Sequence, residues 1–214
     1  MAQPVDFSLY LITDRQQTNG RPLAEVVEAA LKGGVRAVQL REKDLSTKEL
    51  YELALEMRKL TRQYEAKLLI NDRADVALAV DADGVHLGNS SLPLYRVRSL
   101  VGPRKLIGVS CHNQLNVITA QEKGADFVTF GPVYYTPSKT IYGEPVGVGR
   151  LEEVSAISRI PIFGLGGIKP HTIPAVLGHG ASGIALVSAI IAAFDPEAEA
   201  RAILDLISRK QSSR

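Results

Sequence analysis

The chain has 214 residues, of which 25 are Lys or Arg and 23 are Asp or Glu, and it contains a single cysteine. This near-balance of charge gives no reason to expect nucleic acid or an anionic membrane as a partner. One cysteine excludes an internal disulfide, no apolar run approaches the ~20 residues of a membrane helix, and the first residues do not follow the pattern of a signal peptide. We therefore expect a soluble cytoplasmic protein, with self-association left open.

Short apolar segments alternate with amphipathic segments along the chain, which predicts alternating strands and helices. A Ser46–Glu49 capping box and an Asp195-Pro196 start mark two of the helices most clearly. The predicted strands cover residues 9–14, 36–42, 67–71, 84–88, 105–110, 127–133, 161–168 and 183–190. The predicted helices cover residues 22–31, 46–60, 73–80, 92–101, 113–123, 150–157, 169–182 and 195–208.

Eight strands that alternate with eight helices through short loops predict one (β/α)8 TIM barrel of the α/β class. We expect a single domain over residues 1–214, with about 209–214 as a frayed tail. An open doubly wound sheet shows the same alternation and is the alternative. The strand count favours the barrel, and the first strand-to-helix turn lacks the G-x-G-x-x-G of dinucleotide folds.

The last two strands end in features that favour phosphate binding. Gly166 and Gly167 leave the backbone uncovered after the seventh strand, and Ser188 is expected to close the eighth strand with a hydroxyl. Uncovered N–H groups beside a helix N-terminus bind phosphate well. In TIM barrels the phosphate site commonly follows strands 7 and 8. The sequence therefore predicts a phosphorylated small molecule as ligand.

Polar side chains follow the other strands, at the barrel end where active sites lie. They are Asp14, Gln39, Arg41, Lys43, Asn71, Asp72, His86, Ser110, His112 and Lys139. Cations that converge with one or two acids and a phosphate nest suit a pyrophosphate ester and a divalent cation.

Each of these residues also has an ordinary structural interpretation. Asp72 could cap the following helix, Arg41 and Lys43 could lie in surface salt bridges, and the histidines could be structural hydrogen-bond partners. Cys111 and His112 are adjacent on a strand, so they face opposite ways, which argues against a nucleophilic pair.

The segment 134–143 is the longest strand-to-helix excursion. It carries Thr136, Ser138 and Lys139 together with three tyrosines. We interpret it as a substrate clamp, and a surface excursion is the alternative.

Seven short motifs in order resemble the thiamin phosphate synthase family from residue 9 to residue 190. They are QLREK at 39–43, ND at 71–72, GVHLG at 84–88, GVSCH at 108–112, GPVYYTPSK at 131–139, GLGGI at 164–168 and VSAI at 187–190. The resemblance implies a (β/α)8 transferase that joins hydroxymethylpyrimidine diphosphate to thiazole phosphate, releases pyrophosphate and makes thiamin phosphate. The reaction would pass through a dissociated pyrimidine-methyl cation that the thiazole nitrogen traps.

The resemblance also implies roles for individual residues. The pyrimidine diphosphate would be held by Gln39, Arg41, Lys43, Asn71 and Lys139, with Ser110 on the pyrimidine. The thiazole phosphate would be held by Thr136, Ser138, Gly167, Val187 and Ser188. Asp72 would ligate the cofactor Mg²⁺. Neutralising the charge of the pyrophosphate makes it a better leaving group, which the ion, Arg41, Lys43 and Lys139 could do together.

One position departs from the family pattern. The family usually carries a second Mg²⁺-binding Asp where this chain has Ser91. A serine hydroxyl is a far weaker ligand for a hard cation, so the resemblance implies a looser metal site formed by Asp72 and Ser91.

In lacking this Asp, the chain also resembles a sister branch of the family, the thiazole tautomerases. In that branch a histidine at the position of His112 carries a proton and the metal is dispensable. The retained Asp72 and the complete 136–139 segment favour the synthase. A third alternative is a non-catalytic carrier or regulator that only holds thiazole phosphate.

Overall fold

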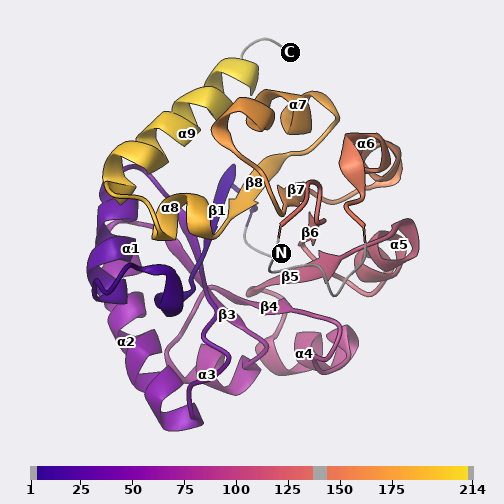
Figure 1. Cartoon of the computed structure of the whole chain (residues 1–214). Coiled ribbons are helices and arrows are strands. Elements are labelled where there is room, and N and C mark those ends of the chain that lie inside the picture. Colours follow the sequence, from indigo (N-terminus) through magenta and orange to yellow (C-terminus); the bar gives the residue numbers. More distant parts are fainter. Residues whose placement is uncertain (1–3, 137–143, 212–214) are drawn as a thin grey trace.

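Eight parallel strands close into a barrel in a computed structural model that describes residues 4–136 and 144–211. Each strand pairs with the next in chain order, and β8 closes the ring against β1 (Figure 1). The strands are β1 Leu9–Ile12, β2 Ala37–Leu40, β3 Lys67–Asn71, β4 Gly84–Leu87, β5 Leu106–Cys111, β6 Phe127–Phe130, β7 Ile162–Leu165 and β8 Gly183–Leu186. The closed ring confirms the predicted (β/α)8 barrel and excludes the open doubly wound sheet.

Helices surround the barrel on its outer side (Figure 1). The α-helices are α1 Leu23–Lys32, α2 Thr47–Gln63, α3 Ala74–Ala79, α4 Leu94–Val101, α5 Gln114–Glu122, α6 Gly147–Ile157, α7 Ile173–Gly178, α8 Ser188–Ile191 and α9 Pro196–Gln211. The 3₁₀ turns η1 Arg15–Gln17 and η3 Pro170–Thr172 precede α1 and α7. No helix within the described residues is long and apolar enough to span a membrane.

Two separate apolar layers hold the barrel together. The larger layer lies between the strands and the helices and contains mainly Leu, Ile, Val and Ala. The smaller layer fills the barrel interior, where Tyr10, Phe127 and Phe163 are fully buried. Phe7 packs on all three rings at centroid distances of 5.2–5.6 Å. Because Phe7 precedes β1, this packing fills the interior at the end where the strands begin.

Local sequence signals place several helix starts as predicted. Ser46 and Glu49 form the expected capping box at the start of α2. Asp195 accepts a hydrogen bond from the N–H of Ala198, so it caps α9 as predicted. Helix α9 continues to Gln211, beyond the expected end near residue 208.

The last strands are shorter than predicted. Strand β6 ends at Phe130, before a cis Gly131-Pro132 bond, and β7 ends at Leu165. Strand β8 ends at Leu186, so the prediction that Ser188 closes this strand is wrong. The backbone turns at Val187, with φ −115° and ψ −90°, and Ser188 opens the short helix α8. The apolar residues 189–190 suggested a strand, but their hydrophobicity fits a buried short helix equally well.

Candidate active site

The strand register brings the predicted polar residues to one end of the barrel. Leu40 of β2 is opposite Ile70 of β3, so Arg41 and Asn71 follow side by side. Asn71 in turn is opposite His86 of β4. These side chains lie at or near the carboxyl ends of adjacent parallel strands, where TIM-barrel active sites lie.

Asp72 lies at the centre of a small polar cluster on this rim. It has a positive φ of 61°, which Asp adopts more readily than most residues. Its Oδ2 accepts a hydrogen bond from Nδ2 of Asn71 at 2.7 Å, and its Oδ1 accepts one from the hydroxyl of Ser91. The Ser91 hydroxyl also accepts a hydrogen bond from the N–H of Gly88 at 2.6 Å. Helix α3 starts without a side-chain cap, so the alternative in which Asp72 caps it is wrong.

The donors around Asp72 bear on whether a divalent cation fits here. Within the described residues, no group of three or more His, Cys, Asp or Glu side chains surrounds a common point. Mg²⁺, however, commonly uses only one or two carboxylates and completes its shell with waters and substrate phosphates. Asp72 supplies one such carboxylate, with the Ser91 hydroxyl beside it. The cluster therefore fits Mg²⁺ as an ion shared with a phosphorylated ligand, not as one enclosed by protein.

A buried hydrogen-bond network crosses the barrel interior between β1, β2, β4 and β5. Gln39 Nε2 donates to the Tyr10 hydroxyl at 3.1 Å, and this hydroxyl lies 3.4 Å from Nδ1 of His86. The other nitrogen of His86 lies 3.0 Å from the Ser110 hydroxyl. Burial raises the pKa of Tyr10, although its hydrogen bond with Gln39 opposes the shift. The neutral phenol and His86 together thus link Gln39, predicted at the diphosphate, to Ser110, predicted at the pyrimidine.

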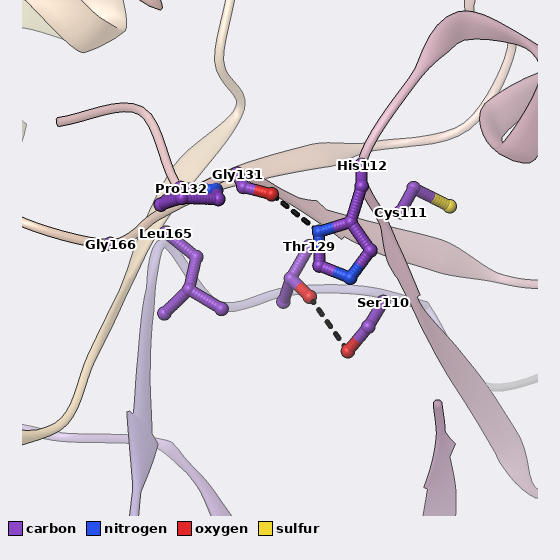
Figure 2. A pocket seen from close by; sticks show the side chains of 8 residues that line it. All are labelled: Ser110, Cys111, His112, Thr129, Gly131, Pro132, Leu165 and Gly166. Atoms are coloured by element: carbon purple, nitrogen blue, oxygen red, sulfur yellow. Dashed lines mark hydrogen bonds between the residues drawn. The ribbon is translucent and has the colours of Figure 1, made fainter. Parts of the chain in front are cut away.

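His112 lines a small pocket together with Ser110, Thr129 and Leu165 (Figure 2). Its Nδ1 lies 2.6 Å from the carbonyl oxygen of Gly131. Because a carbonyl oxygen can only accept, Nδ1 carries a proton and donates it to Gly131, which leaves Nε2 as the nitrogen that can exchange a proton.

The neighbouring Cys111 does not take part in this pocket chemistry. Its sulfur points away from the His112 ring in Figure 2, and the side chain is buried. Burial raises the pKa of the thiol to about 12, so the nucleophilic thiolate is absent at neutral pH. Both observations agree with the sequence argument against a Cys–His nucleophile.

The loops after β6 and β7 are joined by backbone hydrogen bonds. The N–H of Val133 donates to the carbonyl of Leu165 at 2.9 Å, and the N–H of Tyr134 donates to that of Gly166 at 3.0 Å. Gly167 has a φ of 64°, and an added Cβ would come within 2.5 Å of the carbonyl oxygen of Tyr135. The glycine pair is therefore required for close approach of the segment that leads to Thr136.

Ser188 and Val187 lie at the start of α8, directly after β8. In many TIM barrels a short extra helix near the ends of strands 7 and 8 supplies phosphate-binding N–H groups. The guanidinium of Arg21, from the segment before α1, donates to the carbonyls of Ile191, Ala193 and Phe194 at the other end of α8. Arg21 thus fixes α8 to the end of the barrel that carries the other site residues.

Two predicted residues, Ser138 and Lys139, lie outside the described residues. Thr136 is described and half-buried. Sequence reasoning missed one contact set beside Arg41 and Lys43, in which Glu42 pairs with Arg15. These residues are 27 positions apart, so no local pattern relates them.

Comparisons with known proteins identify the family of this chain. A family model described as thiamine monophosphate synthase matches residues 9–190. A relative from Geobacter sulfurreducens, provisionally named a thiamine-phosphate synthase, is 59% identical over 95% of each chain. A thiamine-phosphate synthase from Clostridium novyi is 46% identical over 87% of this chain and 92% of its own length.

A solved structure shows the same likeness in three dimensions. The thiamine phosphate pyrophosphorylase from Pyrococcus furiosus superimposes with a TM-score of 0.88 at 35% identity, over 95% of this chain and 96% of that chain. The family match spans all eight strands, and its limits coincide with the residues over which the motifs resemble the family. The chain therefore belongs to the thiamine monophosphate synthase family.

Proposed function

We propose that this protein is a thiamin phosphate synthase, a transferase that joins hydroxymethylpyrimidine diphosphate to thiazole phosphate and releases pyrophosphate. The observation that carries the proposal is the register of β2 and β3, which brings Arg41 beside Asn71 and Asp72 at one rim. A cation, an amide and a carboxylate at this point suit a diphosphate with a divalent ion. Small phosphorylated molecules are thus the partners, and cytoplasmic location and homo-oligomerisation stay predictions.

The diphosphate side of the site is assigned to β2, β3 and the segment after β6. Arg41, Lys43 and Lys139 supply positive charge, and Gln39 and Asn71 supply hydrogen bonds. Their role is to stabilise the negative charge that builds up on the departing pyrophosphate. Ser110, held by His86, positions the pyrimidine so that its methylene carbon faces the thiazole nitrogen. No protein nucleophile is required, and the buried Cys111 agrees with that.

The thiazole phosphate side is assigned to the ends of β6, β7 and β8. Thr136, Ser138 and Ser188 offer hydroxyls, and Gly167 and Val187 offer backbone N–H groups. The hydrogen bond between Tyr134 and Gly166 supports this assignment, because it joins two of the three segments. The phosphate anchors the thiazole. The C–O bond to pyrophosphate breaks first, and the thiazole ring nitrogen then traps the pyrimidine-methyl cation that is left.

Mg²⁺ is the cofactor that this site would use. Asp72 would hold the ion directly, and Ser91 would contribute a hydroxyl or a water-mediated contact. When bound, the ion would neutralise charge on the diphosphate and so make pyrophosphate a better leaving group.

Incubation of the protein with both substrates and Mg²⁺ tests the proposal. The expected result is thiamin phosphate and pyrophosphate in equal amounts. Omission of either substrate is the control, because neither half of the site alone can complete the transfer. Absence of both products from protein that binds thiazole phosphate would contradict the synthase and leave the carrier alternative.

A thiazole tautomerase is the second candidate, and His112 is the observation that favours it. With Nδ1 donating to Gly131, Nε2 is a base that lines the same pocket as Leu165 and Gly166. Such a group could move a proton on a thiazole carboxylate phosphate. Aromatisation of that compound without Mg²⁺, abolished by His112→Asn, would support this activity, and unchanged compound would exclude it.

A further inference from the structure

The residue between Arg41 and Lys43 is an acid whose surroundings differ from theirs. Glu42 is buried, with a side chain only 2% exposed, whereas Arg41 is half-buried and Lys43 is exposed. Across residues 4–136 and 144–211, the side chains of Arg41 and Lys43 form no hydrogen bond or ion pair. Glu42 therefore does not neutralise its two neighbours, although it lies between them in the sequence.

Arg15, from the loop after β1, is the group that neutralises Glu42. Its backbone N–H lies 3.2 and 3.1 Å from the two carboxylate oxygens, and its Nη1 lies 3.3 Å from Oε2. Thr13 donates its hydroxyl to the same carboxylate at 2.6 Å. A buried carboxylate needs such partners, because burial of an unpaired charge is costly.

The same guanidinium also holds Asp44, on the other side of Lys43. Nη1 and Nη2 of Arg15 donate to the two oxygens of Asp44 at 2.5 and 2.8 Å, a bidentate geometry. The hydrogen bond from Arg15 lowers the pKa of Asp44 to about 2, so the pair is ionised at neutral pH. Arg15 thus engages both acids of the 41–44 segment.

The charge balance of this segment gives the contacts a functional meaning. Arg41 and Lys43 carry two positive charges, and Glu42 and Asp44 carry two negative charges. Without a further cation, the segment has no net charge and its acids compete with any anionic ligand for Arg41 and Lys43. Because Arg15 binds the two acids, Arg41 and Lys43 stay available for an anionic ligand.

A second contact fixes the position of Arg41 itself. The Thr13 hydroxyl accepts a hydrogen bond from the backbone N–H of Arg41 at 2.9 Å while it donates to Glu42. Thr13 and Thr18 are buried, so this loop is firmly packed. The loop after β1 therefore holds both the backbone and the counter-charges of the segment after β2.

We propose that Arg15 is a positioning residue, which binds Glu42 and Asp44 so that Arg41 and Lys43 are kept for the diphosphate of the substrate. This inference rests on the proposed synthase function. It assigns a role in the reaction to the loop after β1, which carries none of the residues that the sequence motifs mark. Arg15 itself bonds to the acids and not to the substrate.

A merely structural tie between two loops makes a different prediction. Loss of such a tie would lower stability and raise the KM values for both substrates alike. Loss of the proposed role would instead raise the KM for the diphosphate and leave the KM for the thiazole phosphate unchanged, because only Arg41 and Lys43 are affected. The ratio of the two KM values therefore separates the two roles.

The test compares Arg15→Gln, Arg15→Lys and Arg62→Gln in otherwise unchanged protein. Arg62 is the matched control, because its ion pair with Asp81 is an exposed contact on α2. We expect Arg15→Gln to raise the KM for the diphosphate about tenfold or more, as expected for lost charge-assisted contacts. Arg15→Lys should give a smaller rise, and Arg62→Gln none.

A double variant provides the sharper test. Asp44→Asn in the Arg15→Gln background removes one of the acids that Arg15 no longer holds, so the KM for the diphosphate should recover in part. A parallel rise in both KM values, or no rise in either, would overturn the proposal. If Arg15→Gln does not fold, the Arg15→Lys comparison decides on the same criterion.

Inorganic pyrophosphate serves as a probe that does not depend on turnover. Its Kd, measured by calorimetry with Mg²⁺ present, should rise in Arg15→Gln by the same factor as the KM for the diphosphate, and an unchanged Kd would refute the role of Arg15. Wild-type protein that binds pyrophosphate but makes no thiamin phosphate would contradict the synthase function alone, so the two failures are distinguishable.

Discussion

The Ser91 hydroxyl donates to Oδ1 of Asp72, although the two residues are 19 positions apart and follow different strands. The same hydroxyl is held by the N–H of Gly88 at 2.6 Å. Ser91 is thus fixed beside the only carboxylate of this cluster among the described residues. This placement is what the metal assignment from the sequence requires of residue 91.

Ser91→Asp should strengthen Mg²⁺ binding. A second carboxylate beside Asp72 raises the ligand charge, so the Mg²⁺ concentration for half-maximal turnover should fall about tenfold, with a rise in synthase rate. Titration of activity and direct Mg²⁺ binding by calorimetry measure this. Ser90→Asp is the control, because Ser90 is exposed and should change neither value. An unchanged or lower rate in Ser91→Asp would place residue 91 outside the metal site.

Gly167→Ala should damage the thiazole phosphate side and the local fold together. The residue has a φ of 64°, and the new Cβ would meet the backbone of Tyr134 and Tyr135. We expect a loss of about 1–3 kcal/mol in unfolding free energy and a higher KM for thiazole phosphate. Gly149→Ala is the control. Gly149 lies on α6, and an added Cβ there would meet no atom within 4 Å. Equal melting temperatures for the two variants would contradict the steric argument.

Lys139→Ala and Arg41→Ala should affect one substrate far more than the other. Both cations are assigned to the diphosphate, so its KM should rise at least about tenfold for each charge removed. Binding of thiazole phosphate, measured by calorimetry in the absence of the diphosphate, should stay within about twofold, the scatter expected for groups that do not touch it. Equal losses on the two substrates would refute the division of the site into two halves.

Cys111 should be chemically silent in the folded protein. Burial raises the pKa of its thiol to about 12, and the side chain is 1% exposed. Iodoacetamide at pH 8 should therefore label it only after denaturation. Cys111→Ala should keep synthase activity and lose about 1 kcal/mol of stability. Loss of activity in a folded Cys111→Ala variant would reopen the question of a thiol nucleophile.

The Arg15–Asp44 pair should make the protein sensitive to acid. Its hydrogen bond with Arg15 lowers the pKa of Asp44 from 3.8 to about 2 in the folded state. A group with a lowered folded pKa stabilises above its unfolded pKa, and that contribution is lost as the pH falls toward the folded pKa. Asp44→Asn should thus be less stable than wild type at pH 6, with the gap closing between pH 3.8 and about 2. Thermal melting at several pH values measures this difference in stability. A difference that stays constant with pH would rule out the linkage.

The amino-acid sequence determined the elements and the family of this protein. Hydrophobic periodicity marked all eight strands, and short-range signals such as the Ser46–Glu49 capping box marked helix starts, because both depend on residues a few positions apart. The order of the motifs at successive strand ends was sufficient to indicate the reaction. Strand ends such as that of β8 were less certain, because a buried short helix and a buried strand have similar apolar composition.

The tertiary structure alone decided which partner each charged residue has. The sequence placed Glu42 between two cations, but the closed barrel brings Arg15 from the neighbouring loop to neutralise it. The fold likewise pairs Ser91 with Asp72, and it excludes the local alternative in which Asp72 caps α3. These contacts join residues that follow different strands, so they depend on strand order and register. A local pattern cannot encode that information, because it arises only when the ring of strands closes.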